Sequence, residues 1–447
     1  MLLSVLLVSC NQAQPQEPEK IDVVRAVEDI ENGTRITEGK IETVSVYKSD
    51  LPEGTITNSA DVVGQFATGY IYKGDYFFAT KLSPKKPQTA EADSDTDTED
   101  SGKLNFDDAG YVLVSDYVEV NTDDDVTADI QKLIDDNPNR TLYFPDGRYL
   151  ISKPLTVPAD PDKTVSLKLS NFAHIKAADT WTKGEPLLKL GATGTANSTD
   201  VGSSFDVEGG ILDGSNLADA IWVMNGVKVF IRYSAIKYAV VGIHVKATEN
   251  GEDPVADVNT VNIIGSGTLD SLGVILETDG NTLTNMRIAE NQVAIKVTGN
   301  RNMLRNLHPL YIFKETFNSA ETYKDSIAFY DGGTCNFYDN CYNDEFATGY
   351  YLVAGNRSVF DCCFNFWYKE GYDYHNAFVC EGQFNATIRQ SDAEFDINRE
   401  GIECNFLLVG EDGGSGIIDA VYYNDENVSE RDVAKDYLIN SPIRSRG

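Results

Sequence analysis

The chain has 447 residues, of which 41% are apolar, and a formal net charge of −33. The apolar fraction excludes a disordered chain, and the length is sufficient for two or three domains. A surface this negative repels nucleic acid phosphates and anionic lipid headgroups, so the charge argues against a protein that binds DNA or RNA. It also disfavours a polyanionic substrate, unless local lysines or arginines or a bound cation reverse the sign at the site.

The chain opens with an apolar run, Met1-Leu-Leu-Ser-Val-Leu-Leu-Val-Ser-Cys10. The run is too short to span a bilayer, which takes about 20 apolar residues, and it is typical of the apolar region of an export signal. Its end, Leu7-Val8-Ser9-Cys10, resembles the bacterial lipobox, which implies lipidation of Cys10. Residues 11–20 are polar and suit a tether. We therefore expect residues 1–20 to be the signal and tether of an exported, membrane-anchored lipoprotein; the alternative is a chance apolar start with a free thiol.

Residues 21–83 have the pattern of a small all-β unit, with Asn32-Gly33 as a tight-turn signal between two short strands. Further motifs follow in chain order: Leu51-Pro52-Glu53-Gly54, Val62-Val63-Gly64, Ile71-Tyr72-Lys73-Gly74-Asp75 and Ala79-Thr80-Lys81-Leu82-Ser83. Together these motifs resemble the SAF family, whose members have a β-clip fold. The resemblance implies a SAF-like β-clip domain that binds a protein partner or a sugar, and it implies no particular activity.

Residues 84–103 are acidic and poor in apolar side chains. Such a segment cannot bury enough surface to offset the entropy of ordering, so we expect a disordered, self-repelling linker. The alternating aspartates at 93–97 lack the glycine and the final glutamate of an EF-hand loop, which argues against a calcium site.

A six-residue pattern recurs 21 residues apart further along the chain: Asn281-Thr-Leu-Thr-Asn285-Met286 is echoed by Asn302-Met-Leu-Arg-Asn306-Leu307. Self-similarity at a short period indicates stacked units that cannot bury their apolar faces alone. The units are rich in Val, Ile, Leu, Asn and Gly and lack a helical period, so they predict a solenoid of short strands, a parallel β-helix. We expect Leu283 and Leu304 to lie one above the other in adjacent coils, and the recurring asparagines to form stacked amide ladders.

The start of the solenoid carries the signals of a cap. Within 126–135, Ile130, Leu133 and Ile134 are spaced for one face of an amphipathic helix, which would cover the open end of the sheets. The stretches 123–135, 143–151 and 209–215 resemble motifs of the pectate-lyase superfamily. This resemblance spans residues 115–423 and implies a β-helix over 104–447. The predicted fold class is all-β: a right-handed parallel β-helix with a capping helix, preceded by the small SAF-like β-clip domain.

Six cysteines lie in the last quarter of the chain: Cys335, Cys341, Cys362, Cys363, Cys380 and Cys404. Several of their spacings are close to one coil, which would stack them about 4.8 Å apart. That distance permits disulfides in an exported protein, and the alternative is a buried ladder of free thiols acting as small apolar groups. There is no Cys-x-x-Cys pair and only four His occur, so the sequence predicts no metal site and no cofactor.

The segment 361–396 is the densest in side chains suited to sugar chemistry. Asp361 and Glu381 are 20 residues apart, which predicts that they lie on neighbouring coils as an acid and base. The candidate catalytic residues are Asp361, Asp373 and Glu381. The candidate substrate-binding residues are Trp367, Tyr368, Tyr372, His375 and Arg389. The alternative is that these aromatic side chains and carboxylates are ordinary loop and surface residues.

Several other polar residues have a structural interpretation. Asp206 and Asp213 form a second carboxylate pair, of which Asp213 suits a turn cap. His244 and His308 stand in strand-like runs and are expected to be structural. The chain lacks the polygalacturonase signatures Gly-His-Gly and Arg-Ile-Lys, and Asn-Thr-Asp occurs only as Asn121-Thr122-Asp123.

The leading functional hypothesis is an exported, lipid-anchored, carbohydrate-active protein, a hydrolase or lyase that acts on a polysaccharide in the lateral groove of the β-helix. Hydrolysis requires two carboxyl groups that face one bond, and elimination requires a base beside an acidified proton. The rival hypothesis is a non-catalytic glycan-binding adhesin or appendage component, docked to a protein partner through its SAF-like domain. We expect no nucleic acid partner.

Overall fold

The computed structural model divides the chain into two units, Met1–Gly102 and Lys103–Gly447. The residues that the structure describes are 20–30, 34–48, 51–52, 54–83, 110–158, 164–191, 206–248, 253–312, 320–353, 355–397, 400–410, 415–419, 421–423, 438–439 and 444–445. The predicted signal with Cys10, the predicted linker and the Asn32-Gly33 turn lie outside these ranges. Neither helix of the described residues is long and apolar enough to cross a membrane.

The N-terminal unit is small and built from strands. Strand β1 (Lys20–Ala26) pairs antiparallel with β2 (Ile41–Tyr47), and β3 (Phe66–Ala67) pairs antiparallel with β4 (Leu82–Ser83). Three short 3-10 helices, Glu38–Lys40, Ser59–Asp61 and Ala79–Lys81, connect them. The core consists of fully buried apolar side chains, among them Val24, Ile30, Ile36, Val62, Ile71 and Phe77. This arrangement confirms the all-β prediction for the segment.

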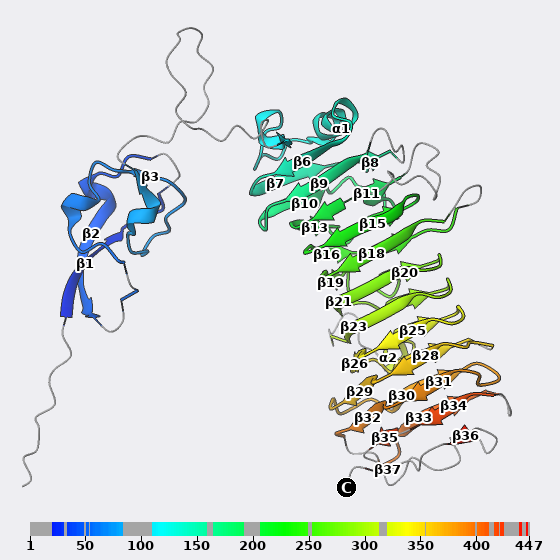
Figure 1. The fold of residues 1–447 in the computed structure, drawn as a ribbon. Coiled ribbons are helices and arrows are strands. Elements are labelled where there is room, and N and C mark those ends of the chain that lie inside the picture. Colours follow the sequence, from blue (N-terminus) through cyan, green and yellow to red (C-terminus); the bar gives the residue numbers. More distant parts are fainter. Residues whose placement is uncertain are drawn as a thin grey trace, which may run out of the picture. The chain divides into compact units, whose positions relative to one another are not determined.

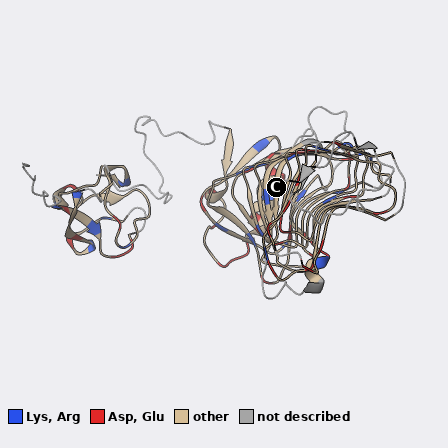
Figure 2. Cartoon of the chain, turned by 90° about the horizontal axis from the view of Figure 1, so that it is seen from below, with Lys and Arg blue, Asp and Glu red and all other residues tan. Residues whose placement is uncertain are grey.

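The C-terminal unit is a parallel β-helix, as predicted, in which successive coils stack along one axis (Figure 1). Each full coil contributes one strand to each of three faces, which we call A, B and C; the strands of faces A and B belong to one 23-stranded sheet, and those of face C form a 10-stranded sheet. Viewed from below, the coils superimpose on one another (Figure 2). Faces A and B meet at a sharp corner, and β21 (Thr282–Ala289) and β23 (Met303–Leu310) run through that corner and belong to both faces.

Face A also comprises β5 (Tyr111–Leu113), β6 (Arg140–Phe144), β9 (Val165–Leu169), β12 (Asp206–Glu208), β15 (Val227–Arg232), β18 (Val255–Asn259), β25 (Phe337–Asp339), β28 (Val359–Asp361), β31 (Thr387–Arg389), β34 (Ile417–Asp419) and β36 (Leu438–Ile439). Face B also comprises β7 (Gly147–Ile151), β10 (Ala173–Ala177), β13 (Ile211–Asp213), β16 (Ala235–Ala239), β19 (Asn262–Gly265), β26 (Tyr342–Asp344), β29 (Phe364–Trp367), β32 (Asp392–Phe395), β35 (Tyr422–Tyr423) and β37 (Arg444–Ser445).

Face C comprises β8 (Leu155–Val157), β11 (Pro186–Leu190), β14 (Asp219–Val223), β17 (Val241–Val245), β20 (Leu272–Leu276), β22 (Val293–Val297), β24 (Ile327–Asp331), β27 (Thr348–Leu352), β30 (Tyr374–Cys380) and β33 (Glu403–Val409). The short helix α2 (Ala320–Lys324) precedes β24 and buries Tyr323.

The interior of the solenoid is filled by stacks of like side chains. Leu283 and Leu304 are direct register partners and both are fully buried, which confirms the predicted register. Further along, Tyr350 stacks between Phe329 and Phe378, with ring centroids 4.7 and 4.8 Å apart. Stacked rings and branched side chains bury large apolar areas, and burial of this kind is the main stabilising contribution.

Helix α1 (Thr127–Asp136) covers the N-terminal end of the solenoid, as predicted (Figure 1). Its buried face includes Ile130, Leu133 and Ile134, the residues that the helical spacing singled out. Gln131 satisfies the free edge of β8: its Nε2 donates to the Thr156 carbonyl at 3.0 Å, and its Oε1 accepts from the Thr156 N–H at 2.8 Å. The helix therefore pairs an edge that would otherwise be open to other strands.

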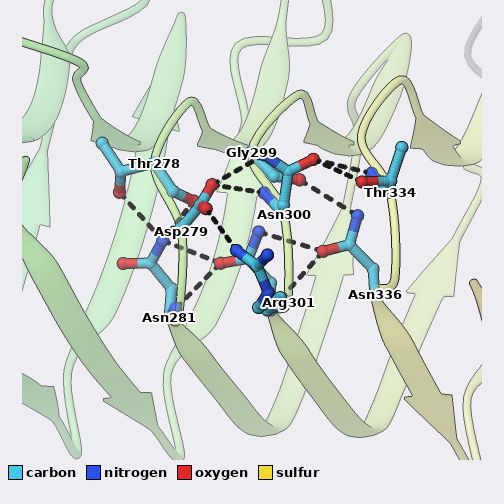
Figure 3. A network of polar contacts seen from close by, with 9 residues as sticks. Thr278, Asp279, Asn281, Gly299, Asn300, Arg301, Thr334 and Asn336 are labelled. Carbon is cyan, nitrogen blue, oxygen red and sulfur yellow. Dashed lines mark hydrogen bonds and ion pairs between the residues drawn. The ribbon is translucent and has the colours of Figure 1, made fainter.

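The recurring asparagines form a buried ladder where face C turns into face A (Figure 3). The Oδ1 of Asn302 accepts from the backbone N–H of Asn281 at 2.8 Å, and the Oδ1 of Asn336 accepts from the N–H of Asn302 at 2.8 Å. All three side chains are at most 1% exposed. The ladder supplies partners to backbone groups that no water can reach, which is why asparagine recurs there.

A second, exposed ladder runs along the corner between faces A and B. Asn306 Nδ2 donates to Asn285 Oδ1 at 2.7 Å, and Asn340 Nδ2 donates to Asn306 Oδ1 at 3.3 Å. The φ angles of Asn285, Asn306 and Asn340 lie between 51° and 55°. Asparagine tolerates this left-handed conformation better than most residues, which favours it at this corner, although other coils have Tyr233, Thr260, Cys362 and Gln390 there with similar φ angles. The predicted amide ladders are thus confirmed, as two separate stacks.

None of the six cysteines among the described residues is part of a disulfide. Cys341 and Cys363 are buried and occupy equivalent positions in adjacent coils, one residue before the register pair Tyr342 and Phe364. Cys380 has Leu352 and Val409 as register partners and Cys404 has His375, so the stacking expected from the spacings to Cys380 and Cys404 is wrong. At Cys341 and Cys363 the structure agrees with the alternative prediction, in which buried thiols act as small apolar side chains.

Candidate functional site

The two carboxylates predicted to adjoin, Asp361 and Glu381, lie on different faces of the solenoid. Asp361 ends β28 on face A, where its register partners are Asp339 and Arg389. Arg389 Nη2 lies 2.7 Å from Asp361 Oδ2 in an exposed ion pair. Glu381 instead follows β30 on face C. The coil from Asp361 to Arg389 takes 28 residues, because its turns are long, so the predicted pairing of Asp361 with Glu381 is wrong.

Trp367 and His375, predicted to bind substrate, are both fully buried. The Trp367 ring stacks on Phe395 at 4.7 Å and its Nε1 donates to a backbone carbonyl at 2.7 Å. His375 Nδ1 accepts from the Tyr323 hydroxyl at 2.9 Å, and its Nε2 faces the Tyr372 carbonyl at 3.2 Å. Burial lowers the pKa of His375 to about 4, so the imidazole is neutral. Their burial contradicts the prediction that these two side chains contact a substrate.

The segment between β29 and β30 carries the remaining predicted residues near the surface. Tyr368 is 54% exposed, and Asp373 is exposed as well. The Tyr372 ring rests against a buried tyrosine, with centroids 4.3 Å apart. Glu345 anchors the segment, because its Oε1 accepts from the backbone N–H groups of Tyr368 and Lys369 at 2.5 and 3.0 Å. The roles of Tyr368, Tyr372 and Asp373 toward a substrate stay predictions.

Face C presents one outward side chain from each strand. In β14, for example, Ile221 and Val223 are buried and only Trp222 between them reaches the surface. The parallel register stacks these outward positions into a single column. The N-terminal half of this face-C column is Thr156, Lys189, Trp222, His244 and Ile275. Its C-terminal half is Lys296, Tyr330, Tyr351, Val379 and Leu408.

The face-C column contains no Asp or Glu, although the whole chain has 70 acidic and 37 basic residues. The outward positions of the other two faces do carry acids. On face A these include Glu208, Asp339, Asp361 and Asp419, and on face B they include Asp213, Asp344 and Glu394. The column itself therefore presents no negative charge to a ligand, although three carboxylates contact it: Glu185, Glu277 and Glu381.

Trp222 is held in place by a buried carboxylate and two lysines. Asp219 Oδ2 accepts from the indole Nε1 at 2.8 Å, while Asp219 Oδ1 accepts from the Val241 N–H at 3.0 Å. Lys246 Nζ lies 3.8 Å and Lys189 Nζ 5.4 Å from the ring centroid. Burial raises the pKa of Asp219. These contacts fix the indole in one orientation on the surface of β14.

His244 and Glu277 form a dyad one coil above Trp222. His244 Nε2 lies 2.9 Å from Glu277 Oε1. Burial lowers the pKa of His244. Burial pushes the pKa of Glu277 up, but the contact with His244 and a hydrogen bond from the Ala247 N–H outweigh this effect and lower it. His244 Nε2 faces the carboxylate outside hydrogen-bond geometry, so the pair is a neutral imidazole beside an ionised carboxylate, the two groups that general-base catalysis by histidine uses.

The C-terminal half of the face-C column continues with aromatic rings. The Tyr330 and Tyr351 rings are stacked, with centroids 5.4 Å apart and an interplanar angle of 8°, and Lys296 Nζ lies 5.6 Å from the Tyr330 ring. The Tyr351 hydroxyl donates to Glu381 Oε2 at 3.2 Å. Glu381, selected from the sequence for another reason, therefore belongs to this face.

The second predicted carboxylate pair, Asp206 and Asp213, lies on two different faces. Asp206 lines a small pocket of face A of about 120 Å³ together with Glu208, and Lys168 and Arg232 form ion pairs with these two carboxylates. Asp213 accepts from the Ser215 N–H at 2.8 Å, which confirms the predicted turn cap. Among the described residues, no group of three or more His, Cys, Asp or Glu side chains is arranged to hold a metal ion.

Sequence reasoning missed Trp222, His244, Lys246 and Glu277 as site residues. His244 was expected to be structural because it stands in the apolar run of β17. The signal that could have found Trp222 and His244 is a single polar or aromatic residue at the fourth position of successive five-residue apolar strands, as in β11, β14, β17 and β22; Lys246 and Glu277 follow the ends of their strands and have no such signal. Such a residue has to point outward, because its neighbours on both sides are buried.

Residues 21–83 match the SAF domain family, which confirms the resemblance of the N-terminal unit. No curated protein matches the sequence.

Several solved structures are similar to this chain. The surface protein and adhesin PfbA of Streptococcus pneumoniae is 12% identical, with 70% of this chain and 94% of that chain covered and a TM-score of 0.40. The catalytic unit of an α-1,3-glucanase from Streptomyces thermodiastaticus is 11% identical, with 94% and 83% covered and a TM-score of 0.40. A family 28 exopolygalacturonase from Yersinia enterocolitica is 11% identical, with 70% and 74% covered and a TM-score of 0.42. Scores this low carry no argument about function, which has to come from the site.

Proposed function

We propose that this protein binds a polysaccharide laid along face C, parallel to the axis of the solenoid. The observation that carries the proposal is the face-C column, a continuous file of aromatic, basic and apolar side chains without any acid. From β11 to β27 the column crosses seven strands, which at ~4.8 Å per strand is about 29 Å, the length of an oligosaccharide. Aromatic side chains with a few placed polar groups are the usual lining of ligand sites.

The His244–Glu277 dyad favours cleavage of the bound chain as a second candidate function. In that case His244 Nδ1 accepts a proton from water or from the sugar, and Glu277 stabilises the imidazolium that results. Trp222, one coil away, holds the sugar ring beside the dyad. Hydrolysis gives new reducing ends, and β-elimination gives unsaturated ends that absorb in the ultraviolet.

The proposal is tested by binding of the full-length protein to a panel of immobilised polysaccharides. Replacement of Trp222 by Ala should weaken binding of the recognised glycan about tenfold or more, since a buried aromatic anchor contributes at least ~1.4 kcal/mol. Tyr233→Ala is the matched control, because Tyr233 is 59% exposed at the corner between faces A and B. Equal binding by both variants, or no binding to any glycan, would overturn the proposal. Product analysis of the wild type and of His244→Ala then decides between binding and cleavage. Products from the wild type that are lost in His244→Ala indicate cleavage, and their absence from both indicates binding alone.

We also propose that the protein is exported and anchored through an acylated Cys10, with the SAF domain contacting a protein partner. The support is the lipobox-like sequence and the polar tether that follows it. Mass spectrometry of the N-terminal peptide from membrane fractions tests the anchor: a diacylated Cys10 is expected, and Cys10→Ser should release the protein. An unmodified Cys10 in the mature protein would refute the anchor and leave the binding proposal untouched.

A further inference from the structure

The lysines of face C recur on every second coil. Lys189 stands on β11, Lys246 follows β17 directly, and Lys296 stands on β22. Along face C the strand order is β11, β14, β17, β20, β22, so one strand lies between each lysine-bearing strand and the next. At ~4.8 Å per coil, the lysines are spaced about 10 Å apart along the axis.

Glu277, which directly follows β20, is the surface carboxylate between Lys246 and Lys296. In the coil of β11 Lys189 is already paired with Glu185, and Asp219 on β14 is buried, with its oxygens bonded to Trp222 and Val241. The positive charges at β17 and β22 therefore lie on either side of one surface carboxylate at β20. Lys246 also lies near enough to Glu277 to contribute to the lowering of the pKa of that carboxyl.

Two of the three lysines keep their ammonium groups available. Lys246 and Lys296 lie over the rings of Trp222 and Tyr330 and form no ion pair with any described residue. A cation held over an aromatic face is fixed in position while its remaining N–H groups stay free to donate. Lys189 already forms an ion pair with Glu185, so we expect it to contribute less to ligand binding than Lys246 or Lys296.

We infer that face C selects a glycan that carries one anionic group, carboxylate or sulfate, on every second sugar. This inference rests on the proposed function and names its substrate class. An extended glycan advances by close to one coil per sugar, so a disaccharide repeat places its anionic group opposite successive lysines. The neutral sugar between Lys246 and Lys296 faces Glu277. A polymer with an anionic group on every sugar would place negative charge against Glu277, which is unfavourable.

The experiment compares the affinities of four soluble polymers for the full-length protein, measured by isothermal titration calorimetry or surface plasmon resonance. The probes are hyaluronan, with alternating carboxylates; κ-carrageenan, with one sulfate per disaccharide; polygalacturonate, with a carboxylate on every sugar; and neutral dextran. We expect one of the first two to bind most tightly, which also identifies the anionic group, and added salt to weaken its binding. Lys246→Gln and Lys296→Gln should each weaken that binding about fivefold.

Lys237→Gln is the matched control, since Lys237 lies on β16 of face B in the same coil as β17 and should leave binding unchanged. Glu277→Gln should improve binding of polygalacturonate, because it removes the opposing charge. Thermal unfolding of each variant checks that it folds. Equal affinity for neutral and alternating polymers, with no effect of the lysine variants, would overturn the inference while leaving the proposed function intact. Failure of all four polymers and of every glycan in the wider panel would instead overturn the proposed function.

Discussion

Leu304 lies directly above Leu283 in the next coil of the solenoid, and both side chains are fully buried. The pair illustrates how the fold is stabilised, because each coil buries its apolar side chains against those of the next coil. Neither coil could bury its leucine alone.

Truncation of one member of this stack should be costly. Leu283→Ala leaves a cavity that the flanking coils cannot close, and we expect a loss of about 2–5 kcal/mol in the free energy of unfolding. Thr284→Ala, one residue along and half-buried on the outer side of the same strand, should change it by less than about 0.5 kcal/mol. Urea denaturation followed by circular dichroism measures both. Similar midpoints for the two variants would show that Leu283 is not a core residue.

The two asparagine ladders should respond differently to substitution. Asn302→Ala removes an acceptor from the buried Asn281 N–H and should destabilise the protein by roughly 2–4 kcal/mol, the cost of unsatisfied buried polar groups. Asn306→Gly keeps a residue suited to φ 54° and loses only an exposed amide contact, so it should cost about 1 kcal/mol or less. The same urea experiment compares them. A larger loss for Asn306→Gly would contradict the assignment of Asn302 to the buried ladder.

Glu345 should make stability depend on pH. Burial raises its pKa from 4.5 to about 7. Below pH 4.5 the carboxyl is protonated in both folded and unfolded chains; between 4.5 and 7 only the unfolded chain ionises, so stability falls as pH rises. The loss should reach about 3 kcal/mol at pH 7 and above. Glu345→Gln should lack this slope, whereas Glu394→Gln, on the surface of face B, should retain it. An unchanged slope in Glu345→Gln would refute the assignment.

The contact between His244 and Glu277 on face C predicts that the pKa of His244 changes when Glu277 is substituted. Because the negative charge of Glu277, 2.9 Å from His244 Nε2, opposes the effect of burial, Glu277→Gln should lower the pKa of His244 further. Proton NMR titration of the imidazole resonances measures the change, with Glu381→Gln as a control on the same face. A pKa that rises or stays constant in Glu277→Gln would show that the two side chains do not interact in solution.

The cysteines should fall into two classes of reactivity. Cys335 and Cys362 are exposed and should react with a thiol reagent in the folded protein. Cys341, Cys363 and Cys380 are buried, and burial raises the pKa of Cys380 to about 11, so they should react only after unfolding. Peptide mapping after timed labelling distinguishes the two classes. Fast labelling of Cys341 would contradict its burial between coils.

The repeat in the sequence was sufficient to predict the solenoid, because stacking requires like side chains at a fixed interval. It gave the Leu283–Leu304 register, the asparagine ladders and the buried face of α1. It failed where the interval changes: the long turns between Asp361 and Arg389 separate Asp361 from Glu381. A local sequence pattern also does not determine whether an aromatic side chain near a corner points into the core or toward solvent. Trp367 and His375 were therefore expected at the surface, although both are buried.

The candidate site escaped prediction for a related reason. Trp222, His244 and Lys296 each stand alone in an apolar strand, and only the stacking of coils brings them into one column. Sequence separation within the column ranges from 21 to 34 residues, so no local motif marks it.

The most direct test of a glycan lying along face C is its affinity for the protein after substitution at two distant points of the column. Trp222 lies on β14 and Tyr351 on β27, five coils further along. If one chain spans both, Trp222→Ala and Tyr351→Ala should each weaken binding of a long oligosaccharide, and a disaccharide should be insensitive to at least one of them. Wild-type affinity in both variants would contradict the account.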